Sequence, residues 1–311
     1  MTIRRLLAFY QISFSTAVAG VIERAPDRMG IVMEFRFRQA ICNEVYGKAP
    51  LADVCRSIRT IGYAGIEIAP FTLADSPSEI ASGQRKQYRK MIESEGLTFV
   101  GLHWLMVSPK GLHVTTPDLA LRERSWGHIR ELIDLCADLG ENGIMVFGSP
   151  QQRATAGGIS RAEAIKNYTL GLAGVAEQAQ NRGVTILVEA LPLNQCDVIN
   201  SLAEAVAIVE QIDSPAVRTM FDTHNAIDET ERHAALIERY FDYIRHVHVN
   251  ELDGRHPGTA GYDFKPVFEV LRRRDYRHWI SMEAFDFTPG AEKIASESLR
   301  YLEKEIQELA A

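Results

Sequence analysis

Short apolar runs alternate with longer amphipathic segments along most of this chain, beginning near Met33. The apolar runs predict strands near residues 33–40, 64–68, 98–103, 143–148, 184–189, 217–222, 244–249 and 279–284. The amphipathic segments predict helices near residues 51–61, 78–95, 117–139, 160–181, 201–212, 230–240, 264–274 and 290–308. Strict alternation of strands and helices is typical of βα units in a parallel sheet. The pattern therefore predicts an α/β protein.

Eight units in succession with no linker between them favour a closed (β/α)8 TIM barrel over residues 33–311, as a single domain. An open doubly wound sheet is the alternative, but the sequence has no glycine-rich dinucleotide loop after its first expected strand. Glycine and proline gather in three connections, at residues 108–113, 148–153 and 254–261. All three follow strands, so we expect them to form the rim of the barrel.

The first 32 residues do not fit the alternating pattern. Arg4 and Arg5 followed by a short apolar stretch loosely imitate a signal peptide, but Gln11 and Ser13 interrupt that stretch. A disordered extension and a start codon placed upstream of a natural first residue at Met33 are the other interpretations. We expect one of these two, and a cytoplasmic protein.

Four of the expected strands in the second half of the chain end in a potential metal ligand. The runs are Val184-Thr-Ile-Leu-Val-Glu189, Val217-Arg-Thr-Met-Phe-Asp222, Ile244-Arg-His-Val-His248 and Trp279-Ile-Ser-Met-Glu283. Parallel strands of a barrel end at the same face, where such folds carry their chemistry. Each residue alone could cap a helix or pair with an arginine. Together, three carboxylates in one barrel mouth would repel one another unless a cation lay between them.

This ligand set predicts one divalent metal ion bound by Glu189, Asp222, His248 and Glu283. Three carboxylates and one imidazole suit Mn²⁺, Mg²⁺ or Co²⁺ better than a structural zinc ion, which would draw on cysteines. A site of this charge favours a neutral polyhydroxy substrate. The ion would polarise a hydroxyketone carbonyl and stabilise an enediolate. No organic cofactor is then required.

Glu189 and Glu283 stand at the two ends of the ligand arc, so we expect them to flank the substrate. Two carboxylates on opposite faces of a planar enediolate can remove a proton and return one. Return to the same carbon is epimerisation, and return to the neighbouring carbon is aldose–ketose isomerisation. If a leaving group lies β to the carbonyl, the same proton abstraction gives elimination, so a lyase is the alternative enzyme. A third interpretation is a non-catalytic barrel or the metal-binding subunit of a hetero-complex. It would predict loss of Glu189, Glu283 or both.

Composition and charge limit the kinds of partner that the protein could bind. The net charge of −7, with both signs interspersed, gives no basic face for nucleic acid. No run approaches the roughly 20 apolar residues of a membrane span. The four cysteines lack CxxC spacing and are expected to be buried free thiols. We predict a small carbohydrate as ligand and no nucleic acid or membrane partner.

Several motifs together resemble the xylose isomerase-like superfamily, and within it the ketose 3-epimerases of tagatose/psicose type. The motifs are Gly65-Ile-Glu-Ile68, Val188-Glu-Ala190, Phe221-Asp-Thr-His-Asn-Ala226, His246-Val-His-Val-Asn-Glu251, the loop from Pro257-Gly258 to Gly261-Tyr-Asp-Phe264, and Ser281-Met-Glu-Ala-Phe285. The resemblance covers about residues 34–305. It implies that the same four ligands bind one ion, most simply Mn²⁺, with Glu189 and Glu283 as acid/base. It also implies that His224 and Arg255 contact substrate oxygens. Relatives are commonly dimers or tetramers, so a homo-oligomer is expected and a hetero-complex stays open.

The chain departs from the ketose 3-epimerase pattern in two places. Those enzymes typically carry Leu-Asn-Arg and a further glutamate after the first metal-binding glutamate, where this chain reads Leu191-Pro-Leu-Asn-Gln-Cys-Asp-Val198. The spacing from His248 to Arg255 is also one residue longer. Whether a free hexulose is the substrate therefore stays open. Relatives of the AP-endonuclease type bind three metals through extra histidines, and Gly148-Ser149 and Phe264-Lys265 stand where this chain would need them.

Further candidates have a functional and a structural interpretation each. His103 could bond a substrate hydroxyl while Trp104 stacks on the sugar, or both could simply pack. Glu67 is either a substrate contact or a salt bridge in the barrel floor. Arg153 lies on an expected rim loop and could contact substrate. His246 is expected on the opposite face of its strand from His248, as a packed or indirect residue.

Overall fold

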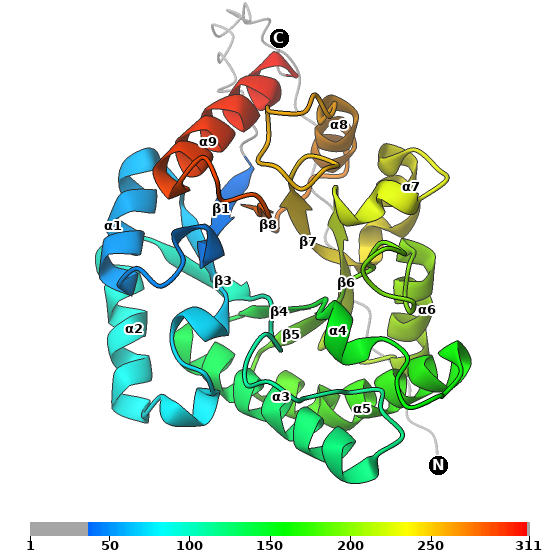
Figure 1. Ribbon diagram of the computed structural model, residues 1–311. Coiled ribbons are helices and arrows are strands. Elements are labelled where there is room, and N and C mark those ends of the chain that lie inside the picture. The colour runs from blue at the N-terminus through cyan, green and yellow to red at the C-terminus, as the bar shows by residue number, and fades with distance from the viewer. Residues whose placement is uncertain (1–36, 310–311) are drawn as a thin grey trace, which may run out of the picture. The chain divides into compact units, whose positions relative to one another are not determined.

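Eight parallel strands close into a barrel in the computed structural model of the protein, which describes residues 37–309. Neighbours in the sheet are neighbours in the chain, and β8 pairs with β1 to close the ring (Figure 1). The strands are β1 (Arg38–Cys42), β2 (Gly65–Ile68), β3 (Thr98–Leu102), β4 (Ile144–Phe147), β5 (Thr185–Val188), β6 (Val217–Asp222), β7 (Ile244–Val249) and β8 (Trp279–Met282). The predicted (β/α)8 barrel is confirmed.

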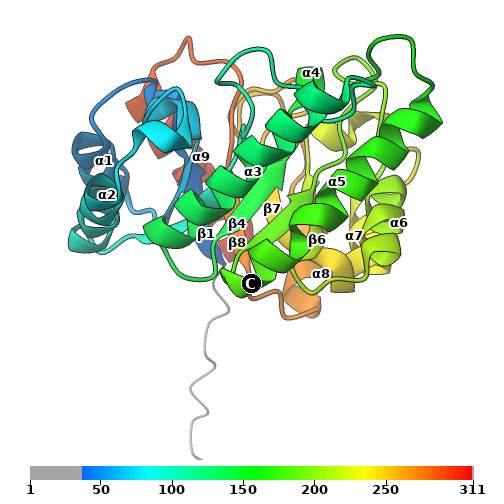
Figure 2. The same ribbon diagram turned by 90° about the horizontal axis from the view of Figure 1, so that it is seen from below.

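Helices surround the strands as an outer layer in Figure 1. They are α1 (Leu51–Ile61), α2 (Ser82–Ser94), α3 (Leu119–Leu139), α4 (Pro150–Arg153), α5 (Arg161–Asn181), α6 (Leu202–Ile212), α7 (His233–Tyr240), α8 (Lys265–Arg273) and α9 (Ala291–Glu308). In the side view of Figure 2 the long helices α3 and α5 run along the barrel wall, with the short α4 at its upper end. Several helices begin at a polar cap: Ser160 and Ser201 each accept a hydrogen bond from the backbone N–H three residues later.

Alternate residues of each strand serve the two sides of the barrel wall. On β5, Ile186 and Val188 pack into the large core between the sheet and the helices. Leu187 instead packs with Val146 and Met220 in a small second cluster. Because side chains alternate along a strand, the residue after Val188 belongs to the same side as Leu187. This alternation aims Glu189 into the barrel mouth.

The first strand ends later than its pattern suggested. It was predicted near residues 33–40, but β1 spans Arg38–Cys42 and is followed at once by the 3-10 helix η1 (Asn43–Tyr46). The expectations for residues 1–32, and the start of that strand, lie outside the described residues. The predicted rim segment 148–153 contains the single helical turn α4, which begins at Pro150.

Loops after the strands form the rim, as expected. The segment between β7 and α8 wraps around the buried carboxylate of Glu251, which accepts hydrogen bonds from the backbone N–H groups of Gly258, Thr259 and Tyr262. All four cysteines are buried and free, as predicted. Within residues 37–309, no helix combines the length and apolar character needed to cross a membrane.

Candidate active site and metal centre

The four candidate metal ligands at the strand ends meet in the barrel mouth. Glu189 follows β5, Asp222 ends β6, His248 lies on β7 and Glu283 follows β8. One ligand atom from each lies within 4.8 Å of the corresponding atoms of the other three. All four side chains are buried, with between 0% and 6% of each residue exposed. The predicted ligand set therefore forms a single cluster.

The imidazole of His248 divides its two nitrogens between the cluster and the barrel interior. Its Nδ1 lies 3.1 Å from Glu283 Oε2 and 3.6 Å from Asp222 Oδ2. Its Nε2 lies 3.1 Å from Oε1 of Glu67, which is fully buried. A carboxylate on the far nitrogen of a metal-binding histidine fixes the ring and its tautomer. His248 is thus arranged to present Nδ1 to an ion.

The prediction for His246 was wrong in its geometry. Residues two apart in a strand share a face, and His246 lies on the same side as His248, with ring centroids 4.9 Å apart. Its Nε2 bonds Oε2 of Glu67 at 2.8 Å. His246 therefore acts on the cluster indirectly, through the same buried carboxylate that holds His248.

Glu67 occupies the floor of the cluster, since the three histidines at positions 103, 246 and 248 surround its carboxylate. Although burial acts to raise its pKa, the charges and hydrogen bonds of His248 and His246 hold the pKa of Glu67 well below its usual range. Both oxygens are engaged by protein groups. This geometry favours the salt-bridge interpretation of Glu67 over direct contact with a substrate.

Crowding of carboxylates is the main electrostatic feature of the cluster. Burial, with repulsion from Glu283 and Asp222, raises the pKa of Glu189 to about 8. Burial also raises the pKa of Glu283, whereas at Asp222 the hydrogen bond and charge of His248 outweigh burial and lower the pKa. A cation between these groups would remove the repulsion. Oxygen-rich ligands with one imidazole and buried, converging atoms fit a divalent ion of the Mn²⁺ type.

Three residues hold the two acid/base candidates in ways that the sequence did not indicate. Asn225 donates its side-chain amide to Glu189 Oε1 at 2.9 Å. Gly148 leaves room for the other oxygen, because a Cβ built there would lie 2.1 Å from Glu189 Oε2. Trp104, for which stacking on a sugar and simple packing were the two interpretations, donates Nε1–H to Glu283 Oε1 at 2.9 Å. Asn225 lies in the Phe221–Ala226 motif, which offered a signal for it.

The remaining predicted substrate contacts fall into two groups. His224 and Arg255 lie at the rim: Nδ1 of His224 bonds Leu252 O at 2.7 Å, and its ring packs on Phe285 with centroids 5.0 Å apart. Arg255 is exposed and pairs with Asp253 at 2.8 Å. His103 lies deeper and is fully buried, with Nε2 2.6 Å from Glu44 Oε2.

Arg153 is also buried rather than solvated on a rim loop. Its guanidinium donates to Phe147 O at 3.0 Å and to Ile199 O at 3.4 Å. It lies over the ring of Tyr168, 6.0 Å from the ring centroid. Arg153 therefore holds the loops after β4 and β5 together, which is a positioning role.

Comparison with known proteins agrees with this geometry. The family model for the xylose isomerase-like TIM barrel matches residues 55–305. The chain belongs to the xylose isomerase-like TIM barrel family. Among curated relatives of this barrel family, L-ribulose 3-epimerase from Mesorhizobium japonicum is 26% identical over 243 residues, which is 75% of this chain and 76% of the relative.

Solved structures share the barrel of this family at lower identity. D-psicose 3-epimerase from Clostridium cellulolyticum superposes with a TM-score of 0.76 at 18% identity, covering 87% of this chain and 99% of the other. 3-Keto-D-glucoside 4-epimerase from E. coli superposes with a TM-score of 0.74 at 18% identity, covering 86% and 100%. At such identities the likeness shows the shared fold.

Proposed function

We propose that the protein is a divalent-metal-dependent epimerase of a sugar or sugar-like hydroxyketone. The observation that carries this proposal is the pair of buried glutamates, Glu189 and Glu283, which face one cluster from opposite ends of the β5–β8 arc. Curated relatives named as L-ribulose and D-psicose 3-epimerases support epimerisation over aldose–ketose isomerisation.

The ion belongs among Glu189, Asp222, His248 and Glu283. Mn²⁺ suits this oxygen-rich set best, and Mg²⁺ or Co²⁺ would also fit. When bound, a divalent ion supplies polarisation of the substrate carbonyl, which makes the adjacent C–H acidic. We propose no organic cofactor, because proton transfer at such a carbon needs only an acid and a base.

The two glutamates would carry the proton on opposite sides of the substrate. One carboxylate removes the proton from the carbon next to the carbonyl, and the other glutamate, in its protonated form, returns a proton to the opposite face. Both tasks require a carboxyl group held within hydrogen-bond reach of the proton that it moves. Asn225 holds one carboxylate oxygen of Glu189, and Trp104 holds one carboxylate oxygen of Glu283. These hydrogen bonds fix the orientation of both carboxylates.

The substrate is proposed to be a small carbohydrate held at the rim by His224 and Arg255. Gln195 lies beside His224, with the two side-chain nitrogens 3.2 Å apart. Gln195, an uncharged amide, lies in the segment that contains arginine and glutamate in the ketose 3-epimerase pattern. Relatives acting on free ketoses and on a keto-glucoside both resemble this chain, so both substrate classes belong in the test.

A substrate panel tests the proposal. Chelator-treated protein, with and without added Mn²⁺, is incubated with free ketoses, aldoses and 3-keto-glycosides, and products are separated by chromatography. We expect an epimer to form only with the metal. A product with new ultraviolet absorbance would instead indicate elimination, and conversion that is unaffected by chelation would contradict metal dependence.

A further inference from the structure

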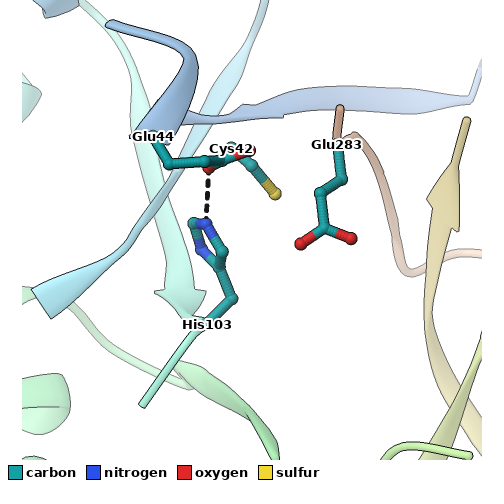
Figure 3. A group of neighbouring side chains, drawn as sticks. All are labelled: Cys42, Glu44, His103 and Glu283. Atoms are coloured by element: carbon teal, nitrogen blue, oxygen red, sulfur yellow. Dashed lines mark hydrogen bonds and ion pairs between the residues drawn. The ribbon is translucent and has the colours of Figure 1, made fainter. Parts of the chain in front are cut away.

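A second group of ligand-type side chains lies beside the first in the barrel mouth. Cys42 ends β1, Glu44 lies in η1, His103 follows β3, and Glu283 is shared with the first cluster. One ligand atom from each of these four lies within 4.8 Å of the others. Figure 3 shows the Cys42 thiol and the Glu283 carboxylate pointing into one space, with the His103 ring directed at Glu44.

These side chains are buried but incompletely paired. No more than 3% of any of the four residues is exposed. Glu44 uses one oxygen to bond His103 Nε2 at 2.6 Å, whereas its Oε1 has no hydrogen-bond partner among residues 37–309. A buried carboxylate oxygen without a partner is costly. A cation in this group would satisfy it.

The thiol of Cys42 has no strong hydrogen-bond partner in the first cluster. Cys42 Sγ lies 3.8 Å from His248 Nε2, but that nitrogen already bonds Glu67. The other nitrogen of His248 faces Asp222 and Glu283. Cys42 also lies in a group with Glu67 and His248, but those two side chains bond each other, which leaves the thiol available to Glu44 and His103. The other three cysteines belong to none of the ligand groups found among residues 37–309.

We propose that Cys42, Glu44, His103 and Glu283 form a second divalent-cation site, with Glu283 shared between the two ions. Sulfur, nitrogen and oxygen ligands together favour Zn²⁺ or Co²⁺ over Mg²⁺. Binding would release the thiol proton of Cys42 to solvent, because a coordinated thiol is deprotonated. The two sites would then differ in chemistry, one oxygen-rich and one containing a thiolate.

Metal counting tests this proposal without reference to activity. Chelator-treated protein is equilibrated with Co²⁺, freed of excess ion, and its cobalt is measured by mass spectrometry. We expect two ions per wild-type chain, one in Cys42→Ala and two in the control Cys136→Ala, which removes a buried thiol elsewhere. One ion in the wild type, or two in Cys42→Ala, would overturn the second site.

A spectroscopic titration tests the same proposal without the Cys42→Ala variant. Thiolate bound to Co²⁺ gives a charge-transfer band in the near ultraviolet, so the wild type should develop this band as the sites fill. Glu44→Gln should lose it, whereas Asp222→Asn, which damages only the first site, should keep it. Absence of the band in the wild type would refute thiolate coordination. Because neither readout needs turnover, failure of the proposed epimerase function would leave this result unchanged.

Discussion

Glu189 shows how closely a single residue is fitted to its neighbours. One carboxylate oxygen accepts from Asn225, and the other occupies the space left by the missing side chain of Gly148. The φ angle of Gly148 is not positive, so alanine could adopt its backbone conformation without strain. Glycine is required there because of the close approach of the carboxylate, and any added carbon must displace Glu189.

We therefore expect Gly148→Ala to lower kcat by about 10- to 100-fold, since misplacing a catalytic group by about 1 Å has effects of that size. The melting temperature measured alongside should change little. Gly174→Ala is the matched control: Gly174 lies in α5 with nothing within 4 Å of its Cβ position. It should keep full activity and gain about 0.5–1 kcal/mol of stability. Wild-type kcat in Gly148→Ala would show that Glu189 tolerates displacement.

The sequence identified the four candidate metal ligands but not the residues that hold them in place. Glu189, Asp222, His248 and Glu283 could be found because each ends an apolar run, and the period of a strand fixes where such residues point. Asn225, Trp104 and Glu44 lie in connections, where no periodicity relates position to direction. Their contacts depend on loops from distant parts of the chain meeting in space, as Trp104 and Glu283 do.

Among the elements, the positions of strands were predicted better than their ends. The pattern placed the first strand near residues 33–40, whereas β1 runs over Arg38–Cys42. Cys42 is therefore the last residue of the strand and does not lie beyond it. Because the strand ends later than predicted, Glu44 was not recognised as a neighbour of the site. The position of His246 was wrong for a different reason: residues two apart on a strand share a face, so His246 lies beside His248 and not opposite it.

The loop between β7 and α8 depends on one buried carboxylate. Glu251 accepts three backbone N–H groups, and the amide of Gln at this position would direct a donor at another donor. We expect Glu251→Gln to lower the free energy of unfolding by about 2 kcal/mol, the range of hydrogen bonds to charged groups. Urea unfolding measures this change.

The same variant should loosen the loop that carries Arg255, which limited proteolysis with trypsin would detect as faster cleavage after Arg255. Glu269→Gln is the control, because Glu269 is an exposed residue of α8. It should match the wild type in both measurements. Equal cleavage in Glu251→Gln and the wild type would contradict the proposed role of the carboxylate in holding the loop.

For the whole molecule, the barrel itself was predictable because eight βα units leave few other arrangements. Strand order follows chain order, and the alternation along each strand brings the candidate ligands to one mouth. For the electrostatics of the site, the sequence predicted the repulsion between the carboxylates but not the size of the resulting pKa shifts. The sequence indicated that the carboxylates would repel one another, but the shift at Glu189 depends on burial and spacing that only the folded chain provides.

That shift makes metal-dependent stability depend on pH. Glu189 has a folded pKa of about 8, above its unfolded value, so between about pH 4.5 and 8 the metal-free protein loses stability as pH rises. Metal binding requires the ionised carboxylates and relieves their repulsion. Mn²⁺ should therefore raise the melting temperature more at pH 8 than at pH 5.5. Thermal unfolding with and without Mn²⁺ measures the difference, and an equal increase at both values would contradict this electrostatic account.

Proton exchange with solvent tests the central claim most directly. A substrate turned over in D₂O by the Mn²⁺-loaded wild type should acquire deuterium at the carbon next to its carbonyl, as followed by NMR. Glu189→Gln and Glu283→Gln should each abolish conversion to the epimer. We expect at least one of the two also to abolish deuterium incorporation, because it removes the base for the first step. Full exchange in both variants would contradict the assignment of these two glutamates as the acid and base.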